Sequence, residues 1–252
     1  PAIKTAAGGL AKTFRDHLQP SPLHVSGGQN QLPAFRALFQ ACENADPPTK
    51  RQKAVAPKLL RKILKASHHS SLLDTVNAVV ADTVIGAFFF ATRSCEHSKP
   101  ATPGKTKCIN LDGLIFRTAR NEVIEHDDSE LLTKAKCTTI TFAQQKNGTK
   151  MDSRTQRRTQ DSELCPVIRC GTAVQRILRT VPGANGSTTI NTIALKGKAG
   201  LITNTHILQT IRATCFSFGG KATFGFDSHE IGDKSIRSGA AMALFINDIS
   251  TA

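Results

Sequence analysis

The sequence predicts an α+β fold that is mainly helical and carries a small antiparallel sheet. Helical patterns cover most of the segments between residues 56 and 246, whereas strand-like patterns are short. Residues 138–143 alternate β-branched and aromatic side chains, and an Asp-Gly pair between two other apolar runs is a strong hairpin signal. The chain has 252 residues and 39% hydrophobic content, which is enough to build a buried core.

Three regions differ in composition. Residues 1–46 contain one amphipathic helix, expected at 32–42, and Gly, Pro and Ser interrupt the remainder, so this region has too few apolar residues for a core of its own. A basic linker and a first helix are expected at 47–66. Residues 67–252 are predicted to form one continuous domain.

The linker begins with two prolines and continues as a basic run. Between Lys50 and Lys65 there are seven Lys or Arg residues and no acidic residue. Because Pro57 is tolerated in a first helical turn, a helix is expected within 56–65. The run is either a solvated basic face, a nuclear-localisation-like patch, or a linker that follows DNA phosphates. Its candidate DNA-binding residues are Lys50, Arg51, Lys53, Lys58 and Arg61.

The remaining elements follow in chain order. Helices are expected at residues 72–80, 82–92, 165–178, 203–215 and 235–246, of which the second is apolar enough to be wholly buried. Strands are expected at residues 107–111, 114–118 and 138–143, with Asp112-Gly113 as the turn between the first two and residues 144–148 as the turn after the third.

Charge and cysteine usage restrict the partners. The chain has 33 Lys and Arg against 19 Asp and Glu, a net charge of +14, so nucleic acid is the first expected partner and an anionic membrane surface the second. No apolar run approaches the roughly 20 residues of a membrane-spanning helix. The seven cysteines lack zinc-finger spacing, which favours free thiols in a reducing compartment. We expect an intracellular protein, nuclear if its source is eukaryotic.

Three basic clusters lie near the ends of expected elements. Arg93 follows the buried helix, with Glu96 three residues later; Lys146 lies in the turn at 144–148; and Lys234 and Arg237 lie at the start of the last helix. Arginine side chains and helix N-termini both bind phosphate oxygens. Together, the three clusters could clamp a phosphodiester.

Each of these residues also has a structural interpretation. Arg93 could cap a helix or form a salt bridge, and Lys146 could be a solvated turn residue. Ser235 could be an N-cap, and the small residues that begin at Gly239 could form a close-packing face.

The segments around these residues resemble the conserved motifs of tyrosine recombinases, the phage-integrase type. AFFFATRSCEHSK resembles the first conserved box, an apolar helix followed by Gly/Thr-x-Arg-x-x-Glu, and IGDKSIRSGAAMALF resembles the second, usually His-Ser-x-Arg-Ser-Gly followed by small residues. KTKCINLDGLIFR, TFAQQKNGTK and DSELCPVIR resemble the hairpin region and the next helix, especially in integrase-like proteins of algal and oomycete mobile elements. The resemblance covers about residues 45–250 and implies that the preceding residues end a helical core-binding domain.

The resemblance implies a role for each basic residue. Arg93 and Arg237 would hold the scissile phosphate and stabilise charge on its oxygens, and Lys146 would protonate the departing 5′ oxygen. Lys234 stands where the family usually has His and, with a reference pKa of about 10.4, is a poor general base. Glu96 would support the arginines. Lys150, Arg154 and Arg157 complete the expected DNA-binding residues.

The family's nucleophile is a tyrosine, and this sequence contains none. The given sequence ends soon after the second box, whereas relatives continue to a His or Trp and then to the tyrosine. We therefore expect a recombinase or integrase core truncated before its nucleophile. Such a core would bind duplex DNA without cutting it. The intact reaction breaks and rejoins DNA through a 3′-phosphotyrosyl intermediate, needs no metal or nucleotide cofactor, and serves integration, excision or transposition, with a homotetramer on DNA.

Two alternatives stay open. The chain could be a degenerate or domesticated DNA-binding protein without catalytic activity, or a basic scaffold protein unrelated to recombination. A scaffold would leave Arg93 and Arg237 unable to contact one phosphate.

Overall fold

The computed structural model describes residues 32–45, 52–68, 76–98, 106–145 and 148–250, together with a few positions between 9 and 23. The chain divides into two units, residues 1–51 and residues 52–252, and the division falls inside the expected linker. In the first unit, helix α2 (Pro33–Ala45) occupies the segment where the amphipathic pattern predicts a helix, and Phe35 and Phe39 stack along it with ring centroids 6.4 Å apart.

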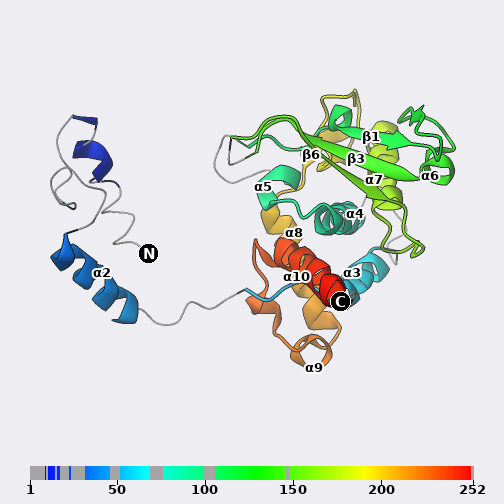
Figure 1. Ribbon diagram of the computed structural model, residues 1–252. Coiled ribbons are helices and arrows are strands. Elements are labelled where there is room, and N and C mark those ends of the chain that lie inside the picture. Colours follow the sequence, from blue (N-terminus) through cyan, green and yellow to red (C-terminus); the bar gives the residue numbers. More distant parts are fainter. Residues whose placement is uncertain are drawn as a thin grey trace. The chain divides into compact units, whose positions relative to one another are not determined.

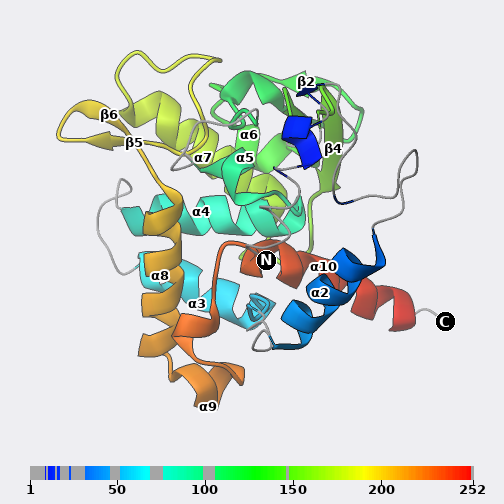
Figure 2. The same cartoon turned by 90° about the vertical axis from the view of Figure 1, so that its left-hand side faces the viewer.

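The second unit is built around one buried helix, α4 (Val76–Phe89). Residues 79–88 of α4 are all buried, which explains why its sequence is apolar on every side. Helices α3 (Pro57–His68), α8 (Asn204–Ser217) and α10 (Ser235–Ser250) lie on one side of α4, and the sheet and helix α7 (Pro166–Thr180) lie on the other (Figures 1 and 2). Each side has its own apolar core.

The sheet has four antiparallel strands in the order β2-β1-β3-β4. The strands are β1 (Leu114–Arg117), β2 (Val123–Ile124), β3 (Cys137–Phe142) and β4 (Asp152–Arg157). In β3 every second residue is buried, as its alternating sequence predicts. A separate two-stranded sheet joins β5 (Thr192–Leu195) to β6 (Lys198–Leu201). Short helices complete the fold: α5 (Ser94–His97), α6 (Leu131–Lys134), α9 (Gly220–Phe224) and the 3₁₀ turns Leu111–Gly113 and Ser228–Glu230. The expected coarse class, α+β with a small antiparallel sheet, is therefore confirmed.

The hairpin predicted around Asp112-Gly113 is wrong. Residues 111–113 form a 3₁₀ turn in which the Gly113 N–H donates to the Asn110 side chain at 3.1 Å, and β1 pairs with β2 and β3 instead of with residues 107–111. A Cβ on Gly113 would lie 2.9 Å from the Thr141 carbonyl oxygen of β3. The glycine thus permits close packing rather than a hairpin turn.

Two further expectations differ from the structure. The helices predicted at 72–80 and 82–92 form one continuous helix over the described residues from Val76, because Asp82, which appears to interrupt the apolar run, is buried and paired with arginines of α7. Strand β4 was not predicted, because its sequence, DSRTQR, is polar throughout. It is held by pairing with β3 along its whole length.

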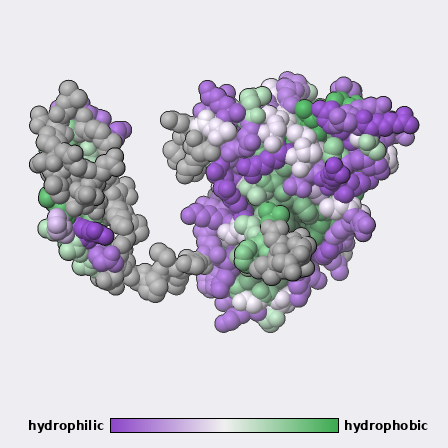
Figure 3. Space-filling view, in the orientation of Figure 1, coloured by the Kyte–Doolittle hydropathy of each residue, from purple (hydrophilic) through white to green (hydrophobic). Residues whose placement is uncertain are grey.

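The surface of the second unit is mostly polar, with an apolar area over α10 (Figure 3). Residues 242–246 of that helix expose four apolar side chains, each with more than half of its surface accessible: Met242, Leu244, Phe245 and Ile246. Among the described residues, no helix is both long and apolar enough to cross a membrane.

Candidate active site

Helix α4 ends in a reversal of the backbone that directs the chain toward Arg93. The Ala91 N–H donates to the Phe88 carbonyl at 3.2 Å and the Thr92 N–H to the Ala87 carbonyl at 3.0 Å, the paired bonds of a Schellman motif. Ala91 has a φ of 49°, a left-handed conformation that glycine usually occupies at this position. The alanine costs about 1 kcal/mol relative to an unstrained residue.

Arg93 immediately precedes the short helix α5 and is held by Glu96. The Glu96 carboxylate accepts the Arg93 backbone N–H at 2.7 Å and its Nη1 at 3.0 Å. Glu96 is buried, whereas 28% of the Arg93 side chain is exposed. All guanidinium hydrogen bonds to described residues use Nη1, so Nε and Nη2 are left to bind a ligand. Glu96 therefore fixes the position of Arg93.

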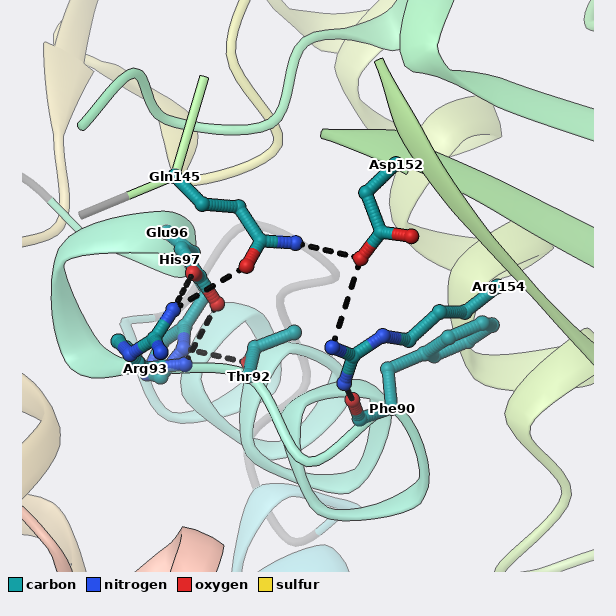
Figure 4. A network of polar contacts seen from close by, with 8 residues as sticks. All are labelled: Phe90, Thr92, Arg93, Glu96, His97, Gln145, Asp152 and Arg154. Atoms are coloured by element: carbon teal, nitrogen blue, oxygen red, sulfur yellow. Dashed lines mark hydrogen bonds and ion pairs between the residues drawn. The ribbon is translucent and has the colours of Figure 1, made fainter. Parts of the chain in front are cut away.

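The turn between β3 and β4 is joined to this pair through Gln145. The Gln145 Oε1 accepts from Arg93 Nη1 at 3.3 Å, and its Nε2 donates to Asp152 Oδ2 at 2.7 Å (Figure 4). Gln145 is 3% exposed. A continuous chain of polar contacts therefore leads from Glu96 across Arg93 to the first residue of β4.

Side chains of β4 also satisfy the last carbonyl groups of α4. Arg154 Nη1 donates to the Phe90 carbonyl at 3.3 Å, and Gln156 Nε2 donates to the Phe89 carbonyl at 2.8 Å. Helix ends leave such carbonyls without intrahelical partners. Arg154, expected to bind DNA, is thus also engaged inside the protein, where its Nη2 lies 3.5 Å from Asp152 (Figure 4).

The start of α10 is fixed by the extended segment 52–56. The Val55 N–H donates to the Ser235 carbonyl at 2.9 Å, and the Gln52 Oε1 accepts the Lys234 N–H at 2.9 Å. Ser235 is buried, and its Oγ accepts the Gly232 N–H at 2.9 Å. Part of the expected linker therefore positions the start of α10, in the segment that resembles the second recombinase box.

Gly239 brings α10 against the end of α4. A Cβ at this position would collide with the Val55 carbonyl oxygen and lie 3.1 Å from the Phe88 ring. Phe88 belongs to the last turn of α4, shortly before Arg93, and Gly239 shortly follows Arg237. The close-packing interpretation of Gly239 is confirmed, and this packing brings the first half of α10 into contact with the last turn of α4.

Both cations of the second box are exposed. The side chains of Lys234 and Arg237 make no hydrogen bond or ion pair with any described residue. They are therefore free to bind an anion.

Three of the expected site residues lie outside the part of the chain that the structure describes: Lys146, Lys50 and Arg51. Lys146 follows Gln145 directly in the sequence.

The other basic-run candidates have internal partners. Arg61 forms two ion pairs, with Asp161 at 2.5 Å and Glu163 at 2.9 Å. Lys53 lies 3.9 Å from Glu230, and Lys58 Nζ donates to the Thr223 carbonyl at 3.2 Å. Lys150 and Arg157, in contrast, are exposed and form no hydrogen bond or ion pair within the described residues. Among the expected site residues that the structure describes, those without an internal partner lie on the β3–β4 hairpin and α10.

A cavity of about 20 Å³ lies behind α5, between α4, α7 and the sheet, and is large enough for a water molecule only. Asp82, Thr83 and His97 contribute polar groups to its lining. His97 Nδ1 lies 2.9 Å from the Thr92 hydroxyl, while His97 Nε2 and Thr83 Oγ1 have no hydrogen-bond partner among the described residues. Burial lowers the pKa of His97 to about 4, so its ring is neutral near pH 7.

Asp82, on α4, forms ion pairs with two arginines of α7. It lies 3.5 Å from Arg169 and 4.0 Å from Arg176. Burial nevertheless raises the pKa of Asp82 to about 6, because desolvation outweighs the attraction of the two arginines. The ion pairs of Asp82 thus link α4 to α7.

The six cysteines whose side chains are described are free thiols. Burial raises the pKa of Cys108 and of Cys170 to about 12, so both are protonated and unreactive at neutral pH. Within the described ranges, no three His, Cys, Asp or Glu side chains are grouped as metal ligands would be. Cys42 lies outside the described side chains.

Sequence reasoning missed Gln145 and Asp152. The available signal was their position, since Gln145 precedes Lys146 and Asp152 opens the strand that returns from the turn.

No model of a known protein family matches the sequence, and a comparison with curated proteins gives no significant match.

Proposed function

We propose that this chain is the DNA-binding core of a recombinase or integrase of the tyrosine-recombinase type. The observation that carries the proposal is the state of Arg93. Its guanidinium is anchored through one nitrogen to buried Glu96 and to Gln145, while its remaining donors are left for a ligand. An arginine held this way is prepared for a phosphate, because its fork geometry matches two phosphate oxygens.

Arg237 would supply the second arm of the clamp. It is exposed in the first turn of α10, and that helix packs at Gly239 against the end of α4 that leads to Arg93. Two guanidinium groups on one phosphate would stabilise the charge that develops on its oxygens in the transition state. Lys146, adjacent to Gln145 in the β3–β4 turn, would donate the proton to the departing oxygen.

The wider surface agrees with a polyanionic ligand. The net charge is +14, and Lys150, Arg157 and Lys234 are exposed without partners in the described part of the chain. Such cations neutralise backbone phosphates and add affinity without reading base sequence. Because the sequence contains no tyrosine, duplex binding without strand cleavage is the expected activity of this chain.

The test is duplex binding as a function of salt. We expect the association constant to fall steeply between about 50 and 200 mM salt, through counterion release. Arg93→Ala and Arg237→Ala should each weaken binding at every duplex sequence and reduce the magnitude of the logarithmic salt slope by about one.

Arg120→Ala is the matched control. This exposed arginine lies in the turn after β1, and its side chain makes no hydrogen bond or ion pair with a described residue. Its removal takes away the same charge at a position outside the proposed clamp. Binding that does not depend on salt, or equal losses in all three variants, would contradict the proposal.

A non-catalytic DNA-binding protein is the second candidate. The observations that favour it are Lys234, where the resemblance places His, and Asp233 before it, where Thr is common. The coding sequence beyond Ala252 separates the two. An in-frame segment that encodes a tyrosine supports the recombinase, and an immediate stop codon supports the binding protein.

A further inference from the structure

Gln145 is a buried polar residue whose groups are all in use. Its side chain contacts Arg93 through Oε1 and Asp152 through Nε2. Its backbone N–H donates to the Thr149 carbonyl at 2.8 Å, and its carbonyl accepts the Gly148 N–H at 3.0 Å. The backbone therefore closes the β3–β4 turn, while the side chain faces the candidate site.

A neutral amide is the group that this position requires. Its oxygen accepts from a guanidinium while its nitrogen donates to a carboxylate, a combination that, among uncharged planar side chains, only the amides of Gln and Asn and the neutral imidazole of His offer. A carboxylate at this position would stand beside the acidic groups of Asp152 and Glu96, and an alkyl group would leave Arg93 Nη1 and the Asp152 carboxylate each with one partner fewer. Gln145 thus orients the arginine without neutralising it.

We propose that Gln145 is a positioning residue for Arg93, which fixes the guanidinium for phosphate binding and ties its orientation to Asp152 at the start of β4. This inference rests on the proposed function, because it assigns Gln145 an effect on ligand binding that acts through Arg93. Glu96 fixes one side of the guanidinium through Nη1, and the Gln145 oxygen supplies a second fixed point on the same nitrogen. With two fixed points, Nε and Nη2 are preorganised for a ligand.

A purely structural role for Gln145 predicts something different. The turn is closed by backbone bonds, which a side-chain substitution leaves in place. If the side chain only stabilised the hairpin, its loss would weaken binding to the same extent whether or not Arg93 is present. If it acts through Arg93, its effect disappears once Arg93 is removed.

The experiment is a double-mutant cycle on the full chain, with a short duplex DNA as the probe. Gln145→Ala is expected to weaken duplex binding about three- to tenfold in the wild-type background and by less than about twofold in Arg93→Ala. Gln145→Met keeps the side-chain length and removes only the amide, so it serves if the alanine variant fails to fold. Gln209→Ala, an exposed glutamine of α8, is the matched control.

The outcomes separate the two proposals. If Arg93→Ala weakens binding and the Gln145 variants weaken it equally in both backgrounds, the positioning role is wrong while the proposed function stands. If Arg93→Ala leaves duplex affinity unchanged, the proposed function itself is wrong. A loss that appears only when Arg93 is present, with Gln209→Ala unchanged, supports the positioning role.

Discussion

The Glu96 carboxylate holds Arg93 twice, through its backbone N–H at 2.7 Å and its guanidinium at 3.0 Å. Because the acid is buried, the pair sets the direction of the arginine at the end of α4 before any ligand arrives. Charge-assisted hydrogen bonds of this kind are the stronger ones in proteins.

Glu96→Gln should therefore weaken both the fold and ligand binding. The amide keeps the size of the side chain, but it is uncharged and only its oxygen accepts hydrogen bonds, so it cannot replace both charge-assisted bonds to Arg93. We expect the free energy of unfolding to fall by about 1–3 kcal/mol, a range that allows for the partial solvent exposure of Arg93. Urea unfolding measures this change in the free energy of unfolding. Glu122→Gln, an exposed acid beyond β1, should change the unfolding free energy by less than about 0.5 kcal/mol. Equal effects in the two variants would contradict the pairing.

Ala91→Gly should stabilise the protein. The alanine adopts a left-handed φ of 49° at the end of α4, and glycine relieves this strain, so the free energy of unfolding is expected to rise by about 0.5–1 kcal/mol. Ala213→Gly, at an exposed interior position of α8, should instead lower it by about 1 kcal/mol. Thermal unfolding of both variants checks the opposite signs, and a destabilised Ala91→Gly variant would refute the strain.

Two buried groups should give opposite pH dependences. Burial raises the pKa of Asp82 from 3.8 to about 6, so the folded state binds more protons than the unfolded state between these values and stability falls as pH rises. Burial lowers the pKa of His97 from 6.5 to about 4, so the unfolded state binds more protons there and stability rises with pH. In the wild type the two slopes largely cancel.

Asp82→Asn should remove that cancellation. The free energy of unfolding of the variant is expected to rise as the pH increases from 4 to 6.5. The titration of His97 gives this rise a limiting slope of about 1.4 kcal/mol per pH unit. His97→Gln should show the reverse slope, from Asp82. Urea unfolding at several pH values measures both, and profiles parallel to the wild type would show that these groups do not titrate as described.

Thr83→Val should raise the free energy of unfolding by about 1 kcal/mol. The Thr83 hydroxyl is buried and has no hydrogen-bond partner among the described residues, so valine, which has the same shape, removes an unmet polar group. Thr214→Val, at a buried position of α8, is the comparison. A loss of stability in Thr83→Val would show that the hydroxyl is satisfied in solution by a bridging water in the adjoining cavity.

Local sequence predicted the elements whose pattern is strong. The helices α2, α3, α7, α8 and α10 and the strand β3 lie where periodicity places them, because each presents a regular apolar face. Strand β4 was missed, since its polar residues are held by β3 rather than by a core. The Asp112-Gly113 hairpin was wrong because the glycine serves a contact with a strand distant in sequence.

The residues of the candidate site could likewise be predicted only in part from the sequence. Arg93, Glu96 and Arg237 were identified from short motifs, but Gln145 and Asp152 become recognisable only when the β3–β4 turn is folded against α5. No local pattern marks a glutamine as the partner of an arginine far away in the chain.

The sequence by itself determined the excess of positive charge, the absence of tyrosine and the local helical segments, because these depend on composition and short-range periodicity. The tertiary structure decided which cations remain free. Arg61 is taken up by Asp161 and Glu163, which lie about a hundred residues away, whereas Arg237 keeps its guanidinium exposed. Ion pairs between distant segments exist only once the chain is folded, so the surface that can meet a phosphate is a property of the fold.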